Sequence, residues 1–412
     1  MVITLKSMIR RDLYLDRLGE FIDKPLIKVI TGIRRSGKSM ILRLLKEELH
    51  RRHVREEQIL NLNFESFEFS DIDTSAKLYR YIKKRISNDR RYYILLDEIQ
   101  EVKTWEKAVN SFSVDFNADV YITGSNSRLL SSELATYLAG RYVEINLYTL
   151  SFSECILFKK VRTSEEKVNP HKEFENYLRT GGFPVLHIAE YEPDSAYKVI
   201  FDIYSSAILR DTIQRNNIRD VELLERVVRY VLDNTGNKFS AKNVADYFKS
   251  QKRRIDLNTV YNYLAALQNA FIIDRIPRYD IKGKEILKTY VKYFAGDHAI
   301  IYTVLGYKDR LISGVLENIV MLELKRRGYR VYTGKLDEKE IDFIAEAGNN
   351  RFYIQVAYKM GGKSTIDREF KPLLEIRDHY PKYVVTMDEL WHDNIEGIKH
   401  VHIADFLLMR EF

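Results

Sequence analysis

Apolar residues in the first 160 positions fall in short runs that alternate with amphipathic stretches. The short runs predict β-strands, and the stretches with apolar residues every three to four positions predict helices between them. Several runs are continuous, which indicates strands that are buried on both faces of a parallel sheet. We therefore predict an α/β domain with a three-layer parallel sheet over residues 1–160. Its expected strands are 26–30, 59–64, 92–96, 118–123 and 142–147.

The pattern after residue 160 is mainly helical and returns to an α/β alternation near the end. Two short helices, 239–248 and 258–267, precede two strand-like runs, an order that predicts a winged helix-turn-helix. We expect a helical linker and winged-helix domain over 161–285. The remaining residues, 286–412, alternate again between helix and strand and predict a second α/β domain.

The segment between the first predicted strand and the next helix has the spacing of a phosphate-binding loop, the Walker A pattern. Such a loop directs backbone N–H groups at phosphate oxygens, its lysine reaches the β- and γ-phosphates, and its serine hydroxyl binds Mg²⁺. A chance glycine turn is the alternative, but the flanking strand and helix favour nucleotide binding. Arg34 and Arg35 point either to the phosphates or to solvent. The predicted binding residues are Gly32, Arg34, Arg35, Ser36, Gly37, Lys38 and Ser39.

Two acidic residues, Asp97 and Glu98, end the continuous apolar run at 92–96. In an open α/β sheet this end of a strand faces the ligand crevice. Asp97 is then placed to hold magnesium, and Glu98 to polarise the attacking water as general base. The alternative is that the pair only caps the following helix. Downstream of a complete Walker A pattern, the pair favours hydrolysis of ATP over binding alone.

Two further segments offer groups to the same site. Ser125 and Asn126 follow the predicted strand 118–123, where Asn126 or Ser125 would sense the γ-phosphate or the water, although a plain turn explains them almost as well. Arg141 precedes the strand 142–147 and would stabilise the transferred phosphoryl group, either within the chain or across a subunit boundary. By its position alone, Arg141 is better explained as a surface residue.

Together these motifs resemble the prokaryotic AAA-like P-loop ATPases of the archaeal-ATPase and AAA-14 type. The resemblance covers nearly the whole chain, and its C-terminal third resembles the DUF-4143-like domain that usually accompanies this ATPase. It implies ATPase activity and strengthens the case for Arg141 as a catalytic residue. Besides the Walker A loop, the resemblance is carried by Leu95–Gln100 with Trp105, Thr123–Asn126, Gly140–Arg141, Tyr177–Pro184 and Leu209–Asp211.

The predicted winged helix offers residues suited to DNA. In a DNA-binding helix-turn-helix, the second helix presents its N-terminal residues to the major groove. Here these residues are Asn258, Thr259, Tyr261 and Asn262. The alternative is a winged helix used for packing or for contact with a protein partner. The basic residues placed for phosphate contacts are Lys252, Arg253, Arg254, Lys282 and Lys284.

The last α/β segment resembles the PD-(D/E)xK core of restriction-endonuclease-like proteins. There an acid on the first helix, an Asp and a Glu-x-Lys strand bind magnesium and activate water. Glu317 and Asp342 match the first two acids, but Gln355 and Ala357 replace the last acid and the lysine. An amide carries no charge and alanine cannot polarise water, so we expect a degenerate site. Lys359 lies on the same strand face as Ala357 and is the candidate replacement lysine.

Composition narrows the setting. The 412 residues are 45% hydrophobic and 30% charged, as in ordinary globular proteins. The single cysteine, Cys155, excludes a disulfide framework and a cysteine-based metal site, and it is typical of a cytoplasmic protein. No apolar run is long enough to span a membrane, so no membrane contact is expected. The net charge of +7 permits contact with nucleic acid without requiring it.

The leading interpretation is an ATP-hydrolysing switch whose appended domains contact DNA or a protein partner. An ATP-regulated DNA nuclease is the first alternative, and it requires that Gln355 and Ala357 be tolerated. A non-catalytic scaffold that keeps ATP for stability is the second. The sequence leaves open whether the chain forms an oligomer.

Overall fold

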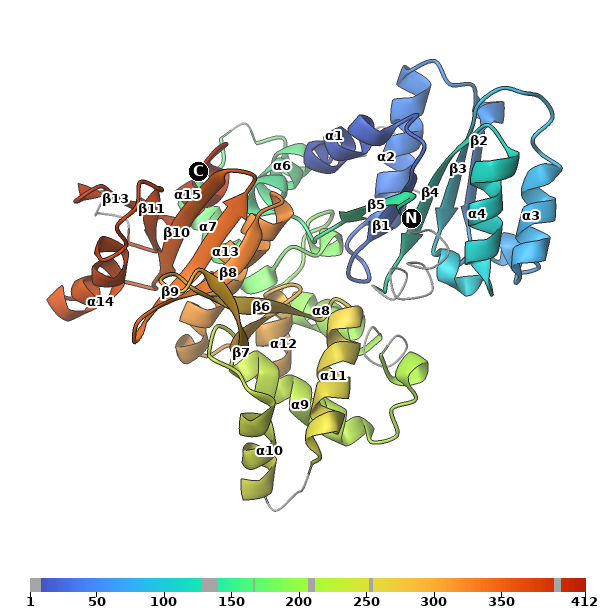
Figure 1. Cartoon of the computed structure of the whole chain (residues 1–412). Helices are drawn as coiled ribbons and strands as arrows, with labels where there is room; N and C mark the ends of the chain where they lie inside the picture. Colours follow the sequence, from blue (N-terminus) through green and yellow to red (C-terminus); the bar gives the residue numbers. More distant parts are fainter. Residues whose placement is uncertain (1–8, 127–139, 166, 207–211, 252–254, 389–393) are drawn as a thin grey trace. The chain divides into compact units, whose positions relative to one another are not determined.

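The structure of the protein is a computed structural model, shown in Figure 1. The chain divides into two compact units between Tyr148 and Thr149, whereas the sequence placed the first boundary at 160. The difference arises because helix α6 packs within the second unit, where Phe152 contacts Phe174. The residues that the structure describes are 9–126, 140–165, 167–206, 212–251, 255–388 and 394–412.

The first unit is a five-stranded parallel sheet in the order β2-β3-β4-β1-β5. Helices α1 and α2 cover one face, where Leu18 and Ile41 pack with Ile30, and α3 and α4 cover the other, where Phe112 packs with Val29. The predicted three-layer parallel sheet is therefore confirmed. Its elements are α1 (Asp12–Phe21), β1 (Ile27–Thr31), α2 (Lys38–Arg51), β2 (Ile59–Asn63), α3 (Ser75–Lys83), β3 (Tyr92–Asp97), α4 (Trp105–Asp115), β4 (Ala118–Gly124) and β5 (Tyr142–Asn146).

The second unit is organised around an eight-stranded mixed sheet in the order β12-β13-β11-β10-β9-β8-β6-β7. Helix α14 packs on it through Phe370 and Leu373, against Ile341 and Tyr353. The strands are β6 (Ile273–Asp280), β7 (Glu285–Ala295), β8 (Arg330–Leu336), β9 (Lys339–Ala347), β10 (Asn350–Val356), β11 (Lys382–Thr386), β12 (Asn394–Ile395) and β13 (Ile398–His402).

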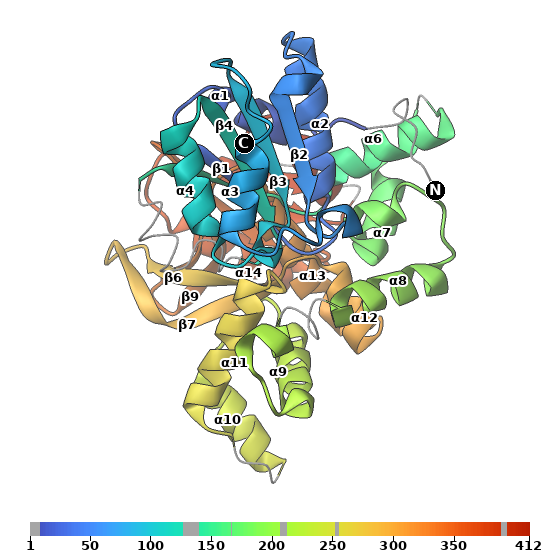
Figure 2. The ribbon, with the colours of Figure 1, turned by 90° about the vertical axis from the view of Figure 1, so that its right-hand side faces the viewer.

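The helices of the second unit include three, α9, α10 and α11, that pack together beside the β6–β7 hairpin (Figure 2). None of the helices in the described ranges is long and apolar enough to cross a membrane. The helices are α6 (Phe152–Thr163), α7 (Pro170–Thr180), α8 (Pro193–Ser206), α9 (Val221–Asp233), α10 (Ala241–Ser250), α11 (Leu257–Asn269), α12 (Ala299–Leu305), α13 (Ile312–Arg326), α14 (Lys363–Leu374) and α15 (Ile403–Leu408).

The hairpin that follows the two short helices does not stand apart from the last α/β segment. Strand β6 pairs with β7 and also with β8, in parallel, at Arg278–Asp280. The expected boundary at 285/286 therefore falls inside this hairpin, and the strands assigned to the wing share one sheet with the nuclease-like strands.

The motif Tyr177–Pro184 forms a tight turn around one buried acid. Gly181 has φ +69°, and a Cβ atom there would collide with the carboxylate of Asp297. The N–H of Gly182 donates to Asp297 Oδ2 at 2.9 Å. Glycine is required because the carboxylate approaches the backbone this closely. The other motif of this resemblance, Leu209–Asp211, lies outside the described residues.

Candidate functional site

The groups expected to form the nucleotide site meet at one edge of the parallel sheet. Strand β1 leads into the glycine-bounded loop, β3 ends at Asp97, and β4 ends at Gly124. Because β4 lies between β1 and β3, the carboxyl ends of these three strands are adjacent. The structure thus brings the loop, the acidic pair and the Ser125–Asn126 segment to the same edge of the sheet, where the sequence predicts a ligand crevice.

The loop adopts a conformation that depends on its glycines. Gly32 and Gly37 have φ values of +151° and +102°. A Cβ atom on Gly32 would collide with the carbonyl oxygen of Leu147. Gly37 is the left-handed N-cap of α2, so Lys38 opens the helix and its positive N-terminal end faces the loop.

Lys38 is buried and lies back over the loop that it follows. Its ammonium donates to the carbonyl oxygens of Gly32 and Ile33, at 3.1 and 3.3 Å. The same ammonium lies 3.6 Å from Glu98 Oε1. These partners hold the charge inside the loop, where a nucleotide phosphate would be received.

The acidic pair is tied together by a threonine of the neighbouring strand. Thr123 Oγ1 donates to Asp97 Oδ1 at 2.6 Å, and it accepts the backbone N–H of Glu98 at 2.9 Å. Burial raises the pKa of Asp97, and hydrogen bonds from Thr123 and Ser39 oppose this rise. A buried carboxylate in contact with a serine hydroxyl offers two hard oxygen ligands, so Ser39 and Asp97 fit a magnesium ion.

Glu98 has an uncommon backbone conformation for a residue with a side chain, with φ +53°. Its Oε2 accepts from Gln100 Nε2 at 2.5 Å, while Oε1 faces Lys38. The side chain is 11% exposed. The carboxylate is therefore oriented by two partners at the edge of the crevice, as a positioned general base requires.

Arg11 contributes to the site although no motif marks it. It is 3% exposed and precedes α1. Its guanidinium donates to the carbonyl oxygens of Ser36 and Tyr148, at 3.0 Å each. Arg11 thus ties the middle of the loop to the segment after β5. The bridging role of Thr123 was also not predicted, although Thr123 lies at the end of the strand beside β3 and opens the motif Thr123–Asn126.

The structure resolves the orientation of the two loop arginines. Arg34 Nη2 lies 3.3 Å from Glu65 Oε1 in an ion pair at the surface. Arg35 is exposed and has φ +67°. Ser36, the third residue of this group, is buried. Arg34 is thus paired with an acidic residue outside the loop, and Arg35 is exposed to solvent. The role of both arginines as nucleotide ligands stays a prediction.

Ser125 and Asn126 are both buried directly after β4, beside the loop and the acidic pair. This position suits the sensor role predicted for Asn126, which stays a prediction. Arg141 lies elsewhere. Its carbonyl oxygen accepts from Ile27 N at 2.8 Å, at the start of β1, and its Nη1 donates to Asn110.

Arg141 is therefore at the opposite edge of the sheet from the loop that follows β1. The five residues of β1 alone span roughly 13 Å at the usual rise of a strand. Arg141 thus lies well away from the phosphate-binding loop of its own chain, and its role as a catalytic residue, within the chain or across a subunit boundary, stays a prediction.

The residues expected to read DNA lie on the exposed first turns of α11. Asn258 is exposed, Thr259 is half-buried, and Tyr261 is 58% exposed. The acidic N-cap Asp256 bonds the N–H of Asn258. The three expected phosphate contacts Lys252, Arg253 and Arg254 lie outside the described residues.

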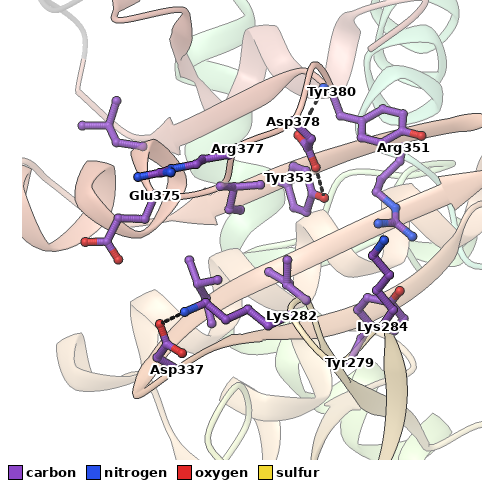
Figure 3. A pocket seen from close by; sticks show the side chains of 14 residues that line it. Tyr279, Lys282, Lys284, Asp337, Arg351, Tyr353, Glu375, Arg377, Asp378 and Tyr380 are labelled. Carbon is purple, nitrogen blue, oxygen red and sulfur yellow. Dashed lines mark hydrogen bonds and ion pairs between the residues drawn. The ribbon is translucent and has the colours of Figure 1, made fainter.

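The tip of the β6–β7 hairpin borders a cavity of about 1000 Å³ (Figure 3). Lys282 pairs with Asp337 at 2.5 Å, whereas Lys284 and Arg377 have no ion-pair partner among the described residues. Arg351 lies 5.4 Å from the ring centroid of Tyr279. Basic groups beside tyrosine rings make this a candidate surface for a phosphate-bearing ligand. The basic and aromatic lining residues are Tyr279, Lys282, Lys284, Arg351, Tyr353, Arg377 and Tyr380.

The nuclease-like positions also come together, in the second unit. Gln355 Oε1 accepts from Asp342 N at 2.7 Å, and Gln355 Nε2 donates to Glu369 at 3.0 Å. Asp342 Oδ2 accepts from Val356 N at 2.9 Å. The amide of Gln355 thus holds two strands and α14 together. Lys359 is exposed and does not enter this cluster in the structure.

Two family profiles match the chain. Residues 24–156 match an AAA domain (AAA_14), and residues 171–311 match a domain of unknown function (DUF8612). The second domain was expected to be DUF-4143-like and to fill the C-terminal third. The matching profile has a different name and covers the helical middle and the hairpin.

Two curated relatives are themselves uncharacterized. A protein of Haemophilus influenzae is 39% identical over 404 residues, which cover 98% of this chain and 99% of that protein. A protein of Methanocaldococcus jannaschii is 31% identical over 356 residues, covering 84% of this chain and 77% of that protein.

A Walker-type ATPase of Pyrococcus abyssi shares the fold, with a TM-score of 0.52 and 16% identity, over 72% of this chain and 95% of that chain. The order of the parallel strands, the glycine-bounded loop and the AAA profile agree with this fold. Residues 24–156 are therefore an AAA domain of the AAA_14 family with the P-loop ATPase fold, and the whole chain belongs to one family with the Haemophilus influenzae protein.

Proposed function

We propose that this protein binds ATP with magnesium and hydrolyses it to ADP and phosphate. The observation that carries the proposal is the Asp97–Glu98 pair, joined by Thr123 and facing Lys38 at 3.6 Å. This arrangement places a cation, a metal ligand and a base at one crevice, which is the set that phosphoryl transfer to water needs.

Each residue has a defined task in this reaction. Lys38 exchanges the carbonyl oxygens of Gly32 and Ile33 for the β- and γ-phosphate oxygens. Ser39 and Asp97 hold the magnesium ion, which neutralises phosphate charge when bound. Glu98 accepts a proton from the water whose oxygen attacks the γ-phosphorus. The bond between the γ-phosphorus and the β–γ bridging oxygen breaks, and ADP leaves with that oxygen.

The test is the Glu98→Gln variant of the full chain, because glutamine keeps the hydrogen bond to Gln100 but accepts no proton. We expect kcat for ATP to fall at least about 100-fold while ATP binding is retained. Glu101→Gln, which changes an exposed acid three residues further along the chain, is the matched control and should keep its kcat. Equal turnover by Glu98→Gln and wild type would remove Glu98 as the base.

We further propose that Arg141 acts on the nucleotide of a neighbouring chain. Its place at the far edge of its own sheet supports this assignment. A mixture of Glu98→Gln and Arg141→Ala chains tests this assignment. The Arg141→Ala chain keeps Glu98 at its own nucleotide, and the Glu98→Gln chain supplies the missing arginine. Activity of the mixture well above the sum of the two separate chains is expected. A mixture that stays at that sum contradicts action between chains.

A second candidate function is contact with DNA at the hairpin cavity, which the unpaired cations Lys284 and Arg377 favour. Phosphate contacts make affinity depend steeply on salt. We expect Lys284→Glu and Arg377→Glu each to weaken binding of a DNA duplex and to flatten its salt dependence, whereas the exposed Lys308→Glu should not. An unchanged salt slope in both variants counts against this surface. The switch role, in which ATP state alters such contacts, belongs to the same proposal.

A further inference from the structure

A buried lysine lies at the centre of the nuclease-like carboxylates. Lys292, on β7, is 2% exposed. Its Nζ is 3.0 Å from Glu317 Oε2, 2.9 Å from Glu340 Oε1 and 3.5 Å from Asp342 Oδ1. An ammonium has three N–H donors, and here each donor has one carboxylate.

The carboxylates come from two elements, so the lysine joins parts of the fold that are distant in sequence. Glu317 is on α13, and Glu340 and Asp342 are on β9. Asp342 and Glu317 are the residues that match the first two acids of the PD-(D/E)xK pattern. Glu340, which no motif marks, is the third.

The cluster is covered by the turn that follows α9. Gly236 has φ +78°, and a Cβ atom there would lie 2.9 Å from Glu317 Oε2. Lys238 pairs with the second oxygen of Glu340 at 3.2 Å. A Cβ on Gly314 would collide with the carbonyl oxygen of Thr235. The turn 235–238 thus packs directly on the carboxylates of Glu317 and Glu340.

The charges also favour an internal cation. Burial opposes the ammonium of Lys292, but the three carboxylates outweigh it and raise its pKa. Burial raises the pKa of Glu317 to about 8, so this carboxyl group holds its proton at neutral pH. Burial also raises the pKa of Asp342, and the charge of Lys292 acts against this rise.

A divalent metal does not fit this arrangement. Magnesium requires oxygen ligands at about 2.0–2.1 Å and keeps several waters. The point among these carboxylates is instead taken by Lys292 Nζ at hydrogen-bonding distances. Gln355 stands where a nuclease of this pattern has another charged ligand. Its amide oxygen accepts from Asp342 N, and its amide nitrogen donates to Glu369.

We propose that Lys292 is the resident cation of this cluster, in the place that a divalent metal takes in a nuclease of this fold. Its ammonium neutralises the carboxylates of α13 and β9 and holds them closed under the turn 235–238. This cluster of the second unit consequently holds no metal and carries out no hydrolytic chemistry.

The test compares the binding of Mn²⁺ to three nucleotide-free full-length chains: wild type, Lys292→Ala, and Lys292→Ala with Asp342→Asn. Removal of the lysine exposes a carboxylate site with room for an ion and its water. We expect Lys292→Ala to bind one more Mn²⁺ per chain than wild type and the double variant to lose it. The phosphate-binding loop contributes equally to all three chains, and exposed Lys308→Ala serves as the control.

Two results would overturn the proposal. One is binding of Mn²⁺ by the wild-type chain that Asp342→Asn removes, because the position would then accept a metal with the lysine present. The other is a folded Lys292→Ala chain that gains no ion. If Lys292→Ala fails to fold, refolding with and without Mn²⁺ decides: recovery with the ion supports the proposal, and no recovery contradicts it.

Discussion

Lys38 and Lys292 are both buried lysines next to carboxylates, and they differ in what else holds them. Lys38 donates to two backbone carbonyl oxygens of a glycine-bounded loop and lies 3.6 Å from one carboxylate. Lys292 is surrounded by three carboxylates and is covered by a turn. An ammonium readily exchanges a neutral carbonyl oxygen for a charged phosphate oxygen. An ammonium that is already paired with carboxylates gains little from such an exchange. Lys38 can therefore take part in a reaction, whereas Lys292 stabilises the fold.

The largest expected effect separates these two roles. Lys292→Ala leaves buried carboxylates without their cation and should lower the free energy of unfolding by about 3–5 kcal/mol, with ATP affinity unchanged. Lys38→Ala should do the reverse, with ATP affinity reduced at least about 30-fold, or ~2 kcal/mol, and little loss of stability. Urea denaturation and nucleotide titration of both variants measure this. Similar losses of stability in the two would erase the distinction.

A smaller effect is expected at Thr123, which orients the acidic pair without touching the nucleotide. Thr123→Val keeps the shape of the side chain but removes the bond to Asp97 and the acceptor for Glu98 N. By analogy with residues that orient metal ligands, kcat should fall about 10–100-fold. Thr163→Val, at an exposed helical position of the second unit, is the control. A normal kcat with normal magnesium dependence would show that the bridge is dispensable.

Arg11 should matter less, because it supports the loop through carbonyl oxygens. Arg11→Ala removes its bonds to Ser36 and Tyr148 and should weaken ATP binding about 10-fold, since hydrogen bonds from charged donors contribute ~1.5 kcal/mol. Isothermal titration of the full chain measures this, with Arg17→Ala on the same helix for comparison. An affinity equal to that of wild type would show that the loop keeps its shape unaided.

The smallest effect is expected at the surface pair of Arg34 and Glu65. Exposed ion pairs contribute roughly 0–1 kcal/mol, so Arg34→Ala should change ATP affinity and stability by less than about fivefold and 1 kcal/mol. A much larger loss of affinity, measured by the same titration, would mean that Arg34 leaves Glu65 for the phosphates.

The sequence predicted those parts of the molecule whose partners lie close together along the chain. The loop from Gly32 to Ser39 and the pair Asp97–Glu98 are local patterns, and the parallel sheet around them is read from alternating runs. The roles of Arg11 and Thr123 were not predicted, because each side chain bonds a partner far away in the sequence. Arg11 bonds the backbone carbonyl oxygen of Ser36, 25 residues away, and Thr123, a residue type common in strands, bonds Asp97, 26 residues away.

The second unit was harder to predict for a related reason. Lys292 is a single lysine in a strand, and its carboxylates lie 25 to 50 residues further along. Only the folded sheet brings them together. The boundary expected at 285/286 falls inside the hairpin. The hairpin pattern in the sequence shows that two strands pair with each other, but not that β6 also pairs with β8.

One reaction tests the central claim that the first unit holds the hydrolytic chemistry and the second does not. Full-length protein is incubated with ATP, magnesium or manganese, and supercoiled plasmid, and both phosphate release and plasmid form are followed. We expect phosphate release that Glu98→Gln reduces at least about 100-fold and that Asp342→Asn leaves unchanged, with the plasmid intact throughout. Plasmid nicking by the wild-type chain that Asp342→Asn abolishes would contradict it.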